Sequence, residues 1–130
     1  MKEIKQLLEL RKALELDCSY NEANKKFFAT KSKTFLKLLA KELGLKDFKV
    51  TYNKGGVAVA GDPRLMGMWD DDNGIYVAID GDRCFGGTNC MFRTIKHMKD
   101  YTGGYNQWLN LNTTSMENII DTMKYRCMRK

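Results

Sequence analysis

The spacing of apolar residues changes abruptly at Gly44, and this change constrains the fold more than any other feature of the chain. Over residues 32–43, apolar residues recur at helical spacing and cover one face of a helix. Over residues 48–53, apolar and polar residues alternate, which is the period of a strand with one buried face. Glycine readily adopts the left-handed conformation found at the C-terminal end of a helix. The sequence therefore predicts a helix that ends just before Gly44 and leads directly into a sheet.

Three further segments have the pattern of helices. Residues 2–16 carry leucine and isoleucine at helical spacing between charged residues, which predicts an amphipathic helix. Ser19 and Glu22 have the spacing of a capping box, so a short helix is expected over residues 20–28. From about Thr114 onward, apolar residues again fall on one face, and basic residues gather near the end, where they suit the helix dipole. The last of these segments is expected to be a closing helix.

The rest of the pattern is that of strands and turns. A glycine-containing turn at residues 53–56 joins the first strand to a second over residues 57–60, which makes a β-hairpin. Residues 61–73 contain the only proline and are expected to form a loop. Further strands are expected over residues 75–80 and 90–97. The predicted fold is therefore α+β, with N-terminal helices, a four-stranded antiparallel β-meander and a C-terminal helix.

Length and composition indicate one domain. The chain has 130 residues, of which 43% are hydrophobic, and this is enough to bury a single core over residues 1–130. No apolar run approaches the roughly 20 residues that span a bilayer, so no membrane contact and a cytoplasmic location are expected. Reduced thiols are expected in that compartment for the few, scattered cysteines. The cysteines are Cys18, Cys84, Cys90 and Cys127.

The net charge of +6 is unevenly distributed along the chain. Lysine and arginine outnumber aspartate and glutamate by 13 to 7 in residues 1–54 and by 7 to 3 in residues 91–130. Between these basic segments, residues 55–90 hold 6 acidic and 2 basic residues. A basic surface speeds the encounter with polyanions, although it does not specify which polyanion.

No known metal motif fits. In the acidic run at residues 70–74, glycine falls at the fifth position, and Gly81 occupies the twelfth, where a calcium loop of the EF-hand type needs glutamate. An acidic turn between two strands is the better interpretation. Cys84, Cys90 and His97, with distant Cys127, lack the closely spaced ligand pairs of structural zinc sites. We therefore expect no metal.

Enzyme motifs are also missing. Nucleophilic catalysis with a histidine base would have to use the single histidine, His97, which is expected to be exposed at the end of a strand. Three glycine pairs occur, at residues 55–56, 86–87 and 103–104. They match neither a phosphate-binding loop nor a dinucleotide fingerprint and are typical of turns. We expect a non-enzymatic protein without a cofactor; the alternative is a small enzyme or ligand-binding domain that uses these turns with Asp80 and Asp82.

Residues 93–108 interleave basic and aromatic side chains around the last glycine pair. This composition suits single-stranded nucleic acid, because phosphates need cations and unstacked bases need flat partners, and it equally suits a protein-binding hot spot. Lysines also recur every four residues along the predicted helix over residues 32–43, as a solvated helix edge or as a phosphate-facing stripe. The candidate binding residues are Lys33, Lys37, Lys41, Lys54, Arg93, Lys96, Lys99, Tyr101, Tyr105 and Trp108.

Two segments resemble known proteins. Residues 54–61, and above all residues 93–104 together with Asn106 and Trp108, resemble segments of small uncharacterised proteins of plasmids, conjugative elements and phages. The resemblance implies a mobile-element setting and supplies no catalytic residues. The first hypothesis is an accessory protein of a mobile element that binds nucleic acid or a nucleoprotein complex. The alternative is an anti-defence inhibitor, such as an anti-CRISPR or anti-restriction factor, that binds a host defence protein.

Overall fold

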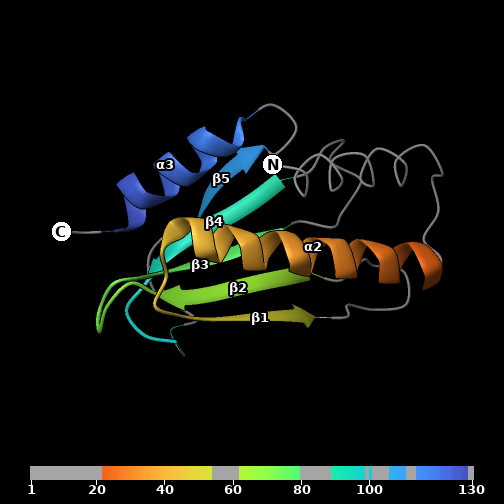
Figure 1. The fold of residues 1–130 in the computed structure, drawn as a ribbon, viewed down its shortest axis with the longest axis horizontal. Helices are drawn as coiled ribbons and strands as arrows, with labels where there is room; N and C mark the ends of the chain where they lie inside the picture. The colour runs from red at the N-terminus through yellow and green to blue at the C-terminus, as the bar shows by residue number, and fades with distance from the viewer. Residues whose placement is uncertain are drawn as a thin grey trace.

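The structure is a computed structural model, and it describes residues 22–53, 62–79, 89–98, 100, 106–110 and 114–128. The elements, in chain order, are α2 (Glu22–Leu43), β1 (Asp47–Asn53), β2 (Asp62–Met68), β3 (Gly74–Ile79), β4 (Asn89–Ile95), β5 (Gln107–Asn110) and α3 (Met116–Cys127) (Figure 1). The helix predicted over residues 2–16 and the strand predicted over residues 57–60 lie outside the described residues.

The five strands form one antiparallel sheet in the order β1-β2-β3-β4-β5, so each strand pairs with its neighbour in the chain. Helix α2 packs on β1 and β2, whereas α3 packs on β3 and β4 (Figure 1). The α+β class predicted from the sequence is therefore confirmed, with five strands described instead of four. Within the described residues, no helix is both long enough and apolar enough to cross a membrane.

The core lies between the sheet and the two helices. Leu65, Val77 and Phe92 stand in register on β2, β3 and β4, and all three are fully buried. They pack in one cluster with residues of both helices, including Leu39 of α2 and Met123 of α3. Because side chains alternate across a strand, the neighbours of these core residues point to the other face of the sheet.

Helix α2 joins two segments that the sequence analysis separates. The predicted helices over residues 20–28 and 32–43 form one continuous helix from Glu22 to Leu43. The intervening residues contain neither glycine nor proline, so nothing there interrupts the hydrogen-bond ladder.

The prediction of a loop over residues 61–73 is wrong, because β2 occupies most of it and is the partner of β1. Pro63 made a strand improbable from sequence alone, since proline lacks a ladder donor. In the structure Pro63 is the second residue of β2 and pairs with Tyr52, and the β2–β3 ladder begins only at Arg64. The proline thus sits beyond the end of one of the two ladders. Strand β5 was also missed, because its four residues are too short for a period of two to be visible.

The predicted glycine cap is confirmed. Gly44 has a φ of 77°, its backbone N–H donates to the Lys41 carbonyl at 3.1 Å, and the Leu45 N–H donates to the Ala40 carbonyl at 3.2 Å. This pair of bonds is the Schellman arrangement, which satisfies carbonyls at the end of a helix.

The end of α2 is also held from the sheet side. The indole Nε1 of Trp69 donates a buried hydrogen bond of 2.7 Å to the Leu43 carbonyl. Gly67 allows the chain after α2 to approach β2, since a side chain at that position would collide with Leu45 and crowd the carbonyl of Asp47. These contacts fix the helix to the turn between β2 and β3.

Two cysteines belong to the core. Cys90 on β4 and Cys127 on α3 are both buried thiols in the cluster between sheet and helices. Burial raises the pKa of the Cys90 thiol from 9.0 to about 12, because the thiolate would lose its hydration. Cys90 is therefore a packing residue and a poor nucleophile near neutral pH.

Replacing Trp69 by phenylalanine should lower the free energy of unfolding by about 1–3 kcal/mol, because the buried carbonyl of Leu43 loses this donor. Urea unfolding followed by circular dichroism measures the change. The matched control is Trp108→Phe, whose exposed ring should change stability by less than about 0.5 kcal/mol. Unchanged stability in Trp69→Phe would mean that this bond does not anchor α2.

Cys90 also predicts a loss of stability at alkaline pH. Above about pH 9 the unfolded thiol releases its proton while the folded thiol keeps it, so the unfolded state binds fewer protons and stability falls as the pH rises toward about 12. Between about pH 8.5 and pH 10 the wild type should lose about 1 kcal/mol more than Cys90→Ala. Equal losses in urea titrations of the two proteins would contradict the buried thiol.

Candidate functional site

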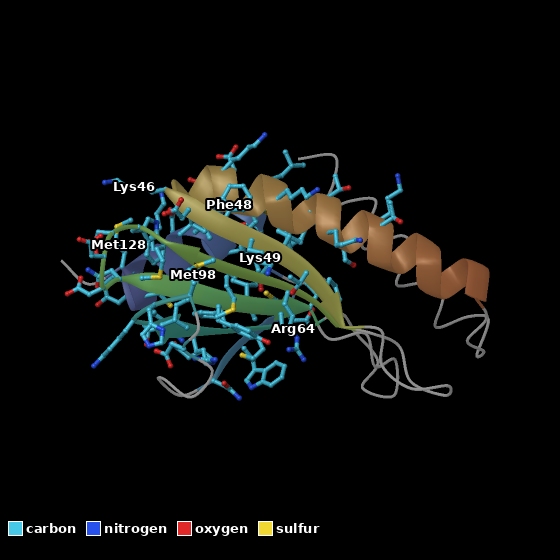
Figure 2. The ribbon with its side chains drawn as sticks, turned by 90° about the horizontal axis from the view of Figure 1, so that it is seen from below. Lys46, Phe48, Lys49, Arg64, Met98 and Met128 are labelled. Carbon is cyan, nitrogen blue, oxygen red and sulfur yellow. The ribbon has the colours of Figure 1, made fainter. Side chains whose placement is uncertain are left out.

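The sheet has a second face, turned away from α2 and α3, which we call the distal face. Strand alternation and cross-strand register place the side chains on it, and Figure 2 shows Arg64 there, whereas Phe48 lies on the α2 side of β1. The side chains of this face include Asp47, Lys49, Thr51, Arg64, Met66, Met68, Tyr76, Ala78, Met91, Arg93, Ile95, Trp108 and Asn110. Several of them pack in a second apolar cluster, separate from the main core.

One cross-strand row of the distal face runs from a cation to an exposed aromatic ring. Arg64 on β2 pairs with Ala78 on β3, Ala78 pairs with Met91 on β4, and Met91 pairs with Trp108 on β5. Trp108 is 56% exposed, whereas its neighbour Leu109 packs against the main core. Ala78 and Met91 are half-buried and form an apolar floor between the two ends of the row.

The cationic end of this row carries an unsatisfied donor. The Nε of Arg64 is buried and has no hydrogen-bond partner among the described residues. A buried donor without an acceptor lowers the stability of the fold. Lys49 is exposed on the neighbouring strand, directly opposite Met66, so two cations stand at the β1–β2 end of the distal face.

The side chain of Arg93, a predicted binding residue, is buried and makes its contacts within the protein. Its side chain is 6% exposed, its guanidinium carbon lies 4.7 Å from the centre of the Tyr76 ring, and its Nη2 donates to the Asp100 carbonyl at 3.0 Å. The Asp100 carboxylate accepts from the backbone N–H of Lys96 at 3.0 Å, and the Asp100 N–H donates to the His97 carbonyl at 3.1 Å. Arg93 thus holds the turn after β4 against the sheet.

The other candidates fall on different surfaces. Lys33 is half-buried and Lys37 and Lys41 are exposed on α2, which covers the opposite side of the sheet from Trp108. Lys96 and His97 are exposed in the turn after β4, as was expected for His97. The predictions for Lys54, Lys99, Tyr101 and Tyr105 lie outside the described residues. The described candidates therefore do not form one continuous surface.

The sequence analysis missed Arg64, Lys49 and Met91 as members of the site. In β2, residues 64–68 alternate between the two faces of the sheet. The strand was not predicted because Pro63 precedes these residues. Without β2, the register that aligns Arg64 with Trp108 cannot be drawn. The exposed tryptophan itself was found from its basic and aromatic neighbourhood.

The acidic run forms a tight turn between β2 and β3, as predicted. The Asp70 carboxylate accepts from the backbone N–H groups of Asp72 at 3.0 Å and Asn73 at 2.9 Å, and the Trp69 N–H donates to the Asn73 carbonyl at 2.8 Å. The carboxylate of Asp70 therefore accepts its hydrogen bonds from within the turn itself. Within the described part of the chain, no three histidine, cysteine or acidic side chains are grouped as metal ligands would be.

Comparison of the chain with protein-family models, with curated proteins and with solved structures finds no match. The resemblance of residues 93–108 to proteins of mobile elements stays a prediction.

Proposed function

We propose that the protein is a non-enzymatic accessory protein that binds nucleic acid against the distal face of its sheet. One observation carries the proposal: the exposed Trp108 shares a face of the sheet with the exposed Lys49 and with Arg64. A flat aromatic ring and cations on one sheet are the two kinds of group that bases and phosphates require.

The charge of the chain supports this assignment. The net charge of +6 favours association with polyanions and raises their encounter rate at low salt. A guanidinium that already lies half-buried on the sheet loses little further hydration when a phosphate oxygen binds to it. The resemblance to proteins of plasmids and phages is consistent with an accessory role on a mobile element.

Fluorescence anisotropy with labelled DNA and RNA oligonucleotides tests the proposal. We expect a complex at low salt that weakens as salt rises, and the double variant Lys49→Ala/Arg64→Ala should bind more weakly and reduce the log–log salt slope by roughly 1.5. The matched control is Lys37→Ala/Lys41→Ala, which removes the same charge from α2 and should change binding less. If neither DNA nor RNA binds at low salt, the proposal is wrong.

A second candidate is the anti-defence inhibitor, which the methionines packed against the distal cluster favour. Met66, Met91 and Met98 pack at the border of the distal cluster, and methionine side chains adapt readily to a protein partner. A stoichiometric nuclease that co-purifies from host lysate at high salt, and that is lost with Trp108→Ala, would support this candidate. A complex that dissociates as the salt concentration rises would count against this candidate.

A further inference from the structure

Resting on the proposed function, we infer that the distal face binds single-stranded nucleic acid in preference to a duplex, with one base stacked on Trp108 and a phosphate held by Arg64. Four features of the distal face carry it.

The first is the accessibility of the indole. Trp108 lies on β5, an edge strand of the described sheet, and more than half of its surface is exposed. A base can stack on such a ring only when one of its own faces is free. Bases inside a duplex are covered on both faces by their neighbours, so this contact selects an unpaired base.

The second feature limits the number of stacked bases. Tyr76 also lies on the distal face, but it is 8% exposed and its ring is already covered by the guanidinium of Arg93 at 4.7 Å. Among the side chains described on this face, Trp108 is therefore the aromatic ring that remains open to a base. One stacked base gives a short footprint and little sequence preference, because every base has a flat face.

The third feature is the shape of the sheet. Five strands spaced about 4.8 Å apart make a face roughly 19 Å wide. The major groove of B-DNA is about 12 Å wide and admits a helix or a two-stranded ribbon, so this sheet cannot enter it. A duplex would touch the face only through its phosphates and would leave the indole unused.

The fourth feature is the separation of the two contact groups. Arg64 and Trp108 stand in one row but on β2 and β5, three strand spacings or about 14 Å apart at the backbone. Ala78 and Met91 lie between them and leave a low apolar floor with no described charge. A flexible strand laid across β3 and β4 can place a phosphate at one end and a base at the other, which a stiff duplex cannot do.

Anisotropy titrations with a labelled mixed-sequence 12-nucleotide strand and with its duplex test this inference, each made once in DNA and once in RNA. We expect a single strand of at least one of the two to bind about tenfold or more tightly than its duplex. Trp108→Ala should weaken single-strand binding by roughly ten- to hundredfold and leave duplex binding unchanged. Trp108→Phe should retain most of the affinity, because phenylalanine keeps a flat face.

Tyr125→Ala is the matched control, because Tyr125 is 88% exposed on α3, on the other side of the sheet. Circular dichroism and thermal unfolding of each variant verify that the fold is retained. Equal binding of single strand and duplex, with no effect of Trp108→Ala, would overturn the inference and leave the proposed function standing. Absence of binding to every probe would overturn both.

Discussion

The burial of one face of the sheet beneath α2 and α3 is the constraint on which the rest of the structure depends. That core contains the side chains of Leu65, Val77 and Phe92. Because side chains alternate along a strand, the neighbours of these residues must lie on the opposite face of the sheet. A slip of register by one residue would exchange the two faces and bury Arg64. The composition of the distal face is thus a consequence of how the core is packed.

Three structural features keep that register in place. Trp69 links the turn between β2 and β3 to the end of α2, so the helix cannot slide along the sheet without breaking a buried hydrogen bond. Gly74 pairs with Met68, and a side chain at Gly74 would meet the Gly67 carbonyl and the Met68 sulfur, so β2 and β3 approach closely there. On the distal face, Arg93 stacks over Tyr76 and ties down the turn after β4. These contacts hold the strands in register and thereby fix the positions of the exposed side chains on the distal face.

Sequence reasoning predicted the elements whose pattern is long and uninterrupted. The helix ending at Leu43, its glycine cap and the acidic turn after Trp69 all follow from local chemistry, and all are confirmed. Strand β2 was missed because proline is rare within strands on average. Pro63 is tolerated because it lies beyond the end of the β2–β3 ladder, and that position depends on tertiary pairing.

The candidate site was predicted less well, for a related reason. Trp108 could be singled out from its neighbours in the sequence, but Arg93, three residues before Lys96 in the same basic stretch, proved to be buried and engaged by Tyr76. Local composition does not reveal whether a side chain on the sheet is exposed, as Trp108 is, or packed against a cross-strand neighbour, as Arg93 is. Arg64 became a candidate only when four strands were placed in register.

The indole N–H signals of the two tryptophans distinguish binding on the distal face from binding elsewhere on the protein. Trp69 is buried and bonded to the Leu43 carbonyl, whereas Trp108 is open on the distal face, so the two signals report on the core and on the site. In ¹⁵N–¹H correlation spectra of the protein titrated with a short single strand, we expect a saturable shift of the Trp108 indole signal while that of Trp69 stays in place. Shifts confined to the backbone amides of α2, with both indole signals unmoved, would contradict it.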